Sequence, residues 1–250
     1  DLVLSHGNGT DRITVKNWFQ EASGRYQLER IEFADGTLWT SAELSAQATT
    51  YTGTEGNDVL NGGNIVLGLM VNGGAGNDTL TTGSANDVLS GGIGNDTLAG
   101  GAGSDTYLFE LGDGQDTIVE NIISTTNVDI LRFGSGIQTT DITASLSNSD
   151  LVLSHGNGTD RITVQNWFRE ASGRYQLERI EFADGTLWTS AELSAQATTY
   201  TGTEGNDVLN GGNIVLGLMV NGGAGNDTLT TGSANDVLSG GTGNDTLTGG

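Results

Sequence analysis

The stretch Gly73–Leu108 reads GGAGNDTLT, TGSANDVLS, GGIGNDTLA and GGAGSDTYL, which is one nine-residue pattern written four times. Each copy begins with glycine or another small residue, continues to Asn-Asp or Ser-Asp, and places a large apolar residue two positions after the aspartate. Glycine permits left-handed turns that other residues avoid, and one apolar residue per repeat fills a narrow core. The pattern therefore predicts an all-β fold of short strands joined by tight turns.

Aspartates recur at one place in this glycine-rich part of the chain: Asp58, Asp78, Asp87, Asp96, Asp105 and Asp116. Two nine-residue repeats make one full coil, so aspartates on the same side should lie about 18 residues apart in sequence. Asp78 and Asp96 have this separation, and so do Asp87 and Asp105. Bare carboxylates about 4.8 Å apart on stacked coils repel each other. Calcium, which accepts six to eight oxygen ligands in flexible geometry, would bind between such carboxylates and nearby turn carbonyls.

The charge distribution supports a need for cations. The formal net charge is −22, and residues 51–120 contain ten Asp and Glu with no Lys or Arg. This sign of charge disfavours nucleic acid and anionic lipid as partners. The chain has no cysteine and only His6 and His155, so disulfides and transition-metal sites are not expected. The run Ile65–Val71 is too short to span a membrane.

The whole chain repeats with a period of 149 residues. Residues 1–101 match residues 150–250 at all but four positions. Each unit has a glycine-rich part and a strand-rich part, which predicts four segments: a partial strand-rich module (1–50), a repeat segment (51–120), a second module (121–199) and a partial repeat segment (200–250). Such near-identity suits interchangeable spacer units more than an enzyme, and we expect no catalytic residues.

The strand-rich part shows short alternating runs at 129–133, 151–153, 161–164 and 177–182. Asn157-Gly158 and Asp184-Gly185 are hairpin turn signals, the second of which pairs Ile180 and Phe182 with Leu187 and Trp188. A short helix is predicted over 166–171, and Thr189 with Glu192 forms a capping box that predicts another. The aromatic residues of this part predict a small conventional core.

The nine-residue pattern resembles the RTX (repeats-in-toxin) family, whose consensus GGxGxDxUx forms a calcium-binding β-helix. This resemblance implies a parallel β-roll in which the sixth-position aspartates bind Ca²⁺. It assigns that role to the six aspartates named above, extends it to Asp113 and Asp129, and places Leu67 where an aspartate is missing. In the second copy it assigns the following residues: Asp207, Asp227, Asp236 and Asp245. The runs at 160–168 and 179–189 resemble the region that accompanies such repeats in large secreted proteins.

The resemblance implies a calcium-binding extender of a giant RTX adhesin or toxin-like protein, located outside the cell or on its surface. Type I secretion would export the chain unfolded, and extracellular calcium would then fold it. Neighbouring units of the same or identical chains are expected partners. Two alternatives remain open: an appendage of a secreted protease, lipase or alginate-modifying enzyme, and a module that binds glycans or a host surface through its aromatic residues.

Overall fold

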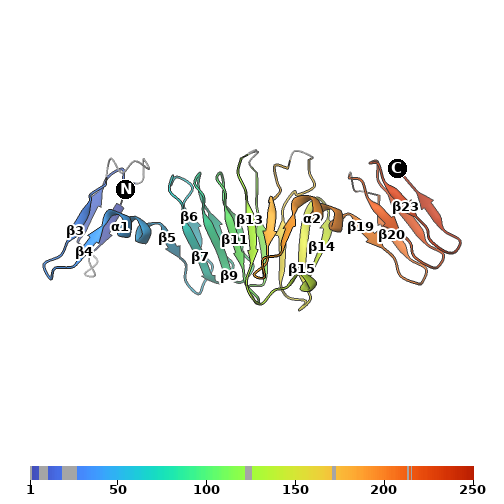
Figure 1. The fold of residues 1–250 in the computed structure, drawn as a ribbon, viewed down its shortest axis with the longest axis horizontal. Helices are drawn as coiled ribbons and strands as arrows, with labels where there is room; N and C mark the ends of the chain where they lie inside the picture. The colour runs from blue at the N-terminus through green and yellow to red at the C-terminus, as the bar shows by residue number, and fades with distance from the viewer. Residues whose placement is uncertain are drawn as a thin grey trace.

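The computed structural model describes residues 2–5, 11–18, 27–121, 126–170, 173–212, 214 and 216–250. The predicted all-β fold with a parallel β-roll is confirmed, and the described residues contain two short α-helices and one 3₁₀ turn beside the strands. Figure 1 shows an elongated row in which a small N-terminal module, a large central body and a C-terminal roll follow one another along the chain.

Two seven-stranded sheets form the central body, and we name each after the strand that comes first in the sequence, β6 or β5. The strands of the β6 sheet, in spatial order, are β14 (Ile142–Ser147), β15 (Asp150–His155), β16 (Arg161–Val164), β12 (Gln115–Ile118), β10 (Thr97–Ala99), β8 (Thr79–Thr81) and β6 (Val59–Asn61). Those of the β5 sheet are β18 (Leu187–Thr189), β17 (Arg179–Glu181), β13 (Ile130–Phe133), β11 (Thr106–Phe109), β9 (Val88–Ile93), β7 (Met70–Ala75) and β5 (Thr50–Thr52). The chain alternates between the two sheets from β5 to β13, which is the path of a β-roll.

The apolar residue of each repeat lies opposite its equivalent on the next coil. In the β6 sheet, Leu80 pairs with Leu98, and Leu98 pairs with Ile118. All three side chains are buried. Burying each contributes about 1.5–3 kcal/mol relative to exposure, so this column is the apolar support that the β6 sheet gives the roll.

Glycine is required where the coils approach most closely. Gly94 has a φ of 151°, and a Cβ there would lie 1.7 Å from the carbonyl oxygen of Gly76 on the preceding coil. No side chain fits at that distance, which explains the glycine of the fourth repeat position.

The companion module shares the core of the roll. β12 pairs in parallel with β16, and β13 pairs in parallel with β17, so both sheets continue from the nonapeptide turns into the strand-rich part. One cluster of buried residues extends from Leu69 to Ala197. The buried residues of the second module join this cluster because β16 and β17 form the next coil of the roll. The boundary predicted at residue 120 stays a prediction.

The hairpin and the capping box of the module are confirmed. Ile180 pairs with Trp188 in the antiparallel β17–β18 hairpin. Helix α2 (Ser190–Ala197) begins after Thr189, whose side chain accepts the N–H of Glu192. The carboxylate of Glu192 in turn accepts the backbone N–H of Thr189, which completes the capping box. A 3₁₀ turn, η1 (Thr139–Asp141), precedes β14.

The predicted helix at 166–171 is wrong over the described residues 166–170, which form a turn and bend. Asn166 has a φ of 58°, a left-handed conformation that does not continue an α-helix. Ala171 lies outside the described residues.

The two ends of the chain repeat parts of the central body. The N-terminal module contains β1 (Leu2–Ser5), β2 (Arg12–Val15), β3 (Arg30–Glu32), β4 (Leu38–Thr40) and α1 (Ser41–Ala48). The C-terminal roll contains β19 (Thr199–Thr201), β20 (Val208–Gly211), β21 (Met219–Asn221), β22 (Thr228–Thr231), β23 (Val237–Ser239) and β24 (Thr246–Thr248).

Candidate metal sites

The predicted aspartates form two ladders along the roll. In ladder one, Oδ1 of each aspartate accepts the backbone N–H of the preceding one, at 2.7 Å for Asp58 to Asp78, 2.7 Å for Asp78 to Asp96 and 3.0 Å for Asp96 to Asp116. In ladder two, the same bond joins Asp87 to Asp105 at 2.8 Å and Asp105 to Asp129 at 2.8 Å. The sequence spacing therefore identified the pairs that lie 18 residues apart, Asp78 with Asp96 and Asp87 with Asp105.

The C-terminal roll reproduces this arrangement. The N–H of Asp207 donates to Asp227 at 2.9 Å, and that of Asp227 donates to Asp245 at 3.0 Å. Asp236 accepts the N–H of Leu218 at 2.8 Å, on the opposite side of the roll.

The second carboxylate oxygen lacks a protein partner in most turns. Buried Oδ2 atoms without any hydrogen bond belong to Asp78, Asp96, Asp105, Asp116, Asp227 and Asp236. Each lies against the first glycine of its own turn where that glycine is present: a Cβ on Gly91, for example, would be 2.2 Å from Oδ2 of Asp96. Burying a charged oxygen without a partner is unfavourable, so these atoms are placed to receive a cation.

The ladder environment raises carboxyl pKa values. Burial, followed by the charges of Asp129 and Asp87, raises the pKa of Asp105 to about 7. Burial, followed by the charges of Asp96 and Asp113, raises the pKa of Asp116 to about 8. Burial also raises the pKa of Asp87 and Asp96. A cation between the carboxylates would favour their ionised form and reverse these shifts.

The first turn of each roll differs from the rest. Oδ2 of Asp58 accepts the N–H of Thr54 at 2.6 Å and its hydroxyl at 2.8 Å. These bonds hold the pKa of Asp58 below its usual value. Asp207 and Thr203 repeat both bonds in the second copy. These two aspartates join the ladders, but their Oδ2 atoms already have donors.

The turn without an aspartate is placed differently from the prediction. Leu69, and not Leu67, occupies the ladder position, because its N–H donates to Oδ1 of Asp87 at 2.6 Å. This turn is two residues longer than a nonapeptide, which shifts the register past Leu67. Leu69 is buried, and a Cβ on Gly62 would lie 2.1 Å from its Cδ1. The leucine therefore takes the place that Oδ2 takes elsewhere.

The two further aspartates that the resemblance assigned to calcium, Asp113 and Asp129, have different places in the structure. Asp129 belongs to ladder two, whereas Asp113 accepts the N–H of Glu110 at 2.8 Å within a loop. Sequence reasoning missed Glu178, whose Oε2 accepts the N–H of Asp129 at 2.6 Å, and the buried Glu120. No nonapeptide motif marks either glutamate.

The residues present fit calcium. Among the described residues, no three Asp, Glu, His or Cys side chains converge on one point that could hold a metal. Ladder carboxylates stacked in successive coils, completed by turn carbonyls, match a hard cation that accepts oxygen ligands in flexible geometry. His6 lies outside the described residues.

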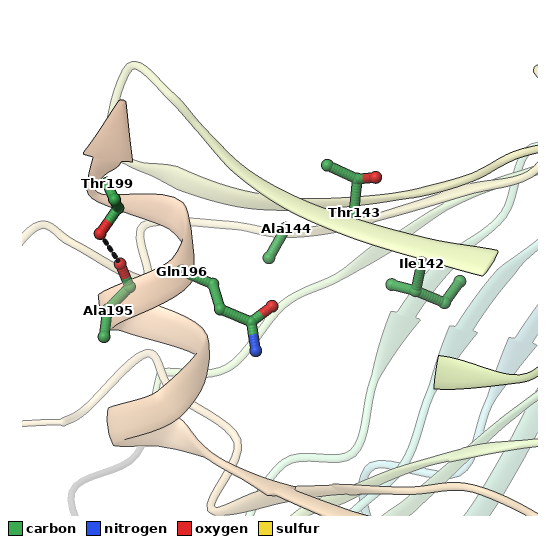
Figure 2. A pocket seen from close by; sticks show the side chains of 6 residues that line it. All are labelled: Ile142, Thr143, Ala144, Ala195, Gln196 and Thr199. Atoms are coloured by element: carbon green, nitrogen blue, oxygen red, sulfur yellow. Dashed lines mark hydrogen bonds between the residues drawn. The ribbon is translucent and has the colours of Figure 1, made fainter. Parts of the chain in front are cut away.

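A groove of about 560 Å³ lies away from the ladders, between β14 and α2 (Figure 2). It is lined by Ile142, Thr143, Ala144, Ala195, Gln196 and Thr199. In Figure 2 the Gln196 side chain extends from the helix toward the strand, while the Thr199 hydroxyl donates to the carbonyl of Ala195. The lining has no carboxylate and no aromatic ring, so neither the metal sites nor the glycan hypothesis draws support from it.

Stacked coils, a single apolar column per sheet and ladders of aspartates whose Oδ2 atoms are mostly unpartnered define a calcium-binding β-roll. The RTX calcium-binding nonapeptide repeat (4 copies) matches residues 46–64, 72–107, 195–213 and 220–250. The haemolysin-type calcium binding protein related domain matches residues 1–43 and 150–192. The chain belongs to the RTX haemolysin-type calcium-binding repeat family, and its repeats bind Ca²⁺.

The individual proteins that resemble this chain match only part of it. The chain is 36% identical over 123 residues to the iron-regulated protein FrpA of Neisseria meningitidis serogroup C, a match that covers 48% of this chain and 10% of FrpA. The crystal structure of the extracellular lipase LipA from Serratia marcescens matches with a TM-score of 0.33 and 20% identity, covering 69% of this chain and 29% of the lipase. That likeness is too low to bear on function. No helix in the described part of the chain has the length and apolar character needed to cross a membrane.

Proposed function

We propose that this chain is an extender segment of a larger secreted or cell-surface protein, and that extracellular calcium folds and rigidifies it. The ligands we assign are the predicted aspartates of both rolls: Asp58, Asp78, Asp87, Asp96, Asp105, Asp116, Asp207, Asp227, Asp236 and Asp245. The observation that carries the proposal is the set of buried Oδ2 atoms without partners. An apolar column of single residues is a small core, so the repelling ladders determine whether the roll folds.

The calcium concentration outside cells supports the proposed location. Extracellular calcium modules bind with Kd values of about 10⁻⁴ to 10⁻³ M, close to the free calcium that surrounds them. Cytosolic calcium is far lower, so a chain with these ladders would stay unfolded until it is exported. Binding then contributes directly to folding, because the unfolded chain has no preformed site.

We further propose that the segment has no catalytic role. Its two nearly identical units succeed each other in an extended row, as spacers do (Figure 1).

Far-UV circular dichroism during a calcium titration tests the proposal, with magnesium as the control cation and EGTA for reversal. We expect a cooperative transition from coil to β-structure at sub-millimolar to millimolar calcium. Magnesium should be less effective because it demands octahedral geometry and retains its waters. A chain with full β-structure in EGTA would refute calcium-driven folding.

A further inference from the structure

Ladder two continues from the nonapeptide turns into the companion module. Ile130 pairs with Arg179 where β13 meets β17, so Asp129 lies opposite Glu178. Oε2 of Glu178 accepts the N–H of Asp129 at 2.6 Å, which is the bond that each ladder aspartate makes to its predecessor. Glu178 therefore occupies the next step of the ladder, although it lies 49 residues further along the chain.

Glu120 brings another carboxylate to the same end of the ladder. Leu98 pairs with Ile118, which places Glu120 in register with Gly100, the first glycine of the turn that carries Asp105. Glu120 is 3% exposed and accepts a short hydrogen bond from the hydroxyl of Tyr107. The buried Tyr107 in turn accepts the N–H of Gly100 at 2.8 Å, so the phenol fixes the position of the glutamate.

These side chains gather negative charge around a free oxygen. Burial, followed by the charges of Asp129, Asp105 and Glu178, raises the pKa of Glu120 to about 8. Asp105 is fully buried, and its Oδ2 has no hydrogen-bond partner. None of the ion pairs found between described residues includes these carboxylates.

We propose that the calcium ladder extends one step beyond the nonapeptide repeats, with Glu178 and Asp129 supplying carboxylates for a calcium ion at the junction of roll and module. Glu120 lies beside this ion and adds a third negative charge, and backbone carbonyls complete the oxygen ligands. One cation would then join the two parts of each unit. This inference rests on the proposed function and adds a ligand from outside the repeat motif.

The first copy of the module provides a matched control. Glu29 corresponds to Glu178 in an identical stretch of sequence, and its carbonyl likewise accepts the N–H of the first residue of the following helix, Ser41. Both glutamate side chains are exposed, but no described strand of a roll pairs with β3 on the side where β13 pairs with β17. One chain thus contains two equivalent glutamates, of which Glu178 continues a ladder and Glu29 does not.

The test is the number and affinity of calcium ions bound by the full chain, measured by isothermal titration calorimetry for wild type, Glu178→Gln and Glu29→Gln. Glutamine retains an oxygen for the N–H of Asp129 and removes only the charge. We expect Glu178→Gln to lose one calcium ion, or to bind it at least about tenfold more weakly. Glu29→Gln should match wild type.

Equal calcium binding by Glu178→Gln and Glu29→Gln would overturn the inference and leave the proposed function standing. A wild-type chain that binds no calcium would overturn both. If Glu178→Gln does not reach the wild-type circular dichroism spectrum in saturating calcium, Glu120→Gln decides, because it keeps an acceptor for Tyr107. Weaker binding of one ion by Glu120→Gln would support the site, and unchanged binding would refute it.

Discussion

Oδ1 of Asp96 accepts the backbone N–H of Asp78 at 2.7 Å, while Oδ2 of the same carboxylate is buried without a partner. One oxygen therefore fixes the stacking of two coils, and the other faces the first glycine of its own turn. The hydrogen bond favours the stacked coils in any state, whereas the free oxygen opposes them unless a cation is present. This division explains how one residue both builds the roll and makes it depend on calcium.

Replacing Asp78 and Asp96 together by asparagine should raise the calcium concentration at the folding midpoint by about tenfold or more. Asparagine keeps an oxygen acceptor for the ladder N–H groups but removes the charges that attract calcium, and each tenfold change corresponds to about 1.4 kcal/mol. The measurement is far-UV circular dichroism over a calcium titration. An unchanged midpoint would contradict the assignment of these two aspartates as ligands.

Asp58 provides the control within the same ladder. Its Oδ2 already accepts two hydrogen bonds from Thr54, so it has less need of a cation. Asp58→Asn should therefore shift the midpoint less than Asp96→Asn alone.

The calcium-free chain should become less stable as pH rises from about 4 to 8. The pKa values of Asp105, Asp116 and Glu120 are raised to about 7, 8 and 8, above the ordinary values near 4 that hold in the unfolded chain. The folded state thus binds more protons across this window, and the stabilisation present at pH 4 is lost as pH rises through the folded pKa values. In EGTA we therefore expect any β-structure that far-UV circular dichroism detects at pH 5 to be lost by pH 8.

Calcium should reverse this dependence, because it competes with protons for the same oxygens. In saturating calcium, Tm should be higher at pH 8 than at pH 5, as measured by thermal melts at both values. A calcium effect that does not depend on pH would mean that the raised carboxyls do not bind the ion.

Much of the roll follows from local sequence. The nine-residue period fixes the apolar column through Leu80 and Leu98 and the 18-residue spacing of stacked aspartates, because every residue involved lies within one or two turns. The placement of Leu67 failed since a turn of irregular length shifts the register without any sign in the consensus. Glu178 was missed because the β14–β15 hairpin separates it from Asp129, so only the parallel pairing of β13 with β17 brings them together.

Leu69→Ala should destabilise the calcium-loaded chain by about 2–5 kcal/mol, the usual range for truncating a buried leucine. Leu69 is 3% exposed and packs where the coil approaches Gly62. Leu67→Ala is the matched control, because Leu67 is only half-buried and makes no ladder bond. Urea unfolding in saturating calcium measures both, and a larger effect at Leu67 would contradict the register found for this turn.

The duplicated module permits a comparison of one residue in two settings. Ile162 is 1% exposed between β12 and β15, whereas its copy Ile13 is 63% exposed. Ile162→Ala should cost about 2–5 kcal/mol, while Ile13→Ala should change stability by no more than about 0.5 kcal/mol. Denaturant unfolding with calcium present measures the difference. An equal loss from both variants would mean that the apolar surface around Ile13 is covered in solution, and a dependence of that loss on protein concentration would identify a second copy of the chain as the cover.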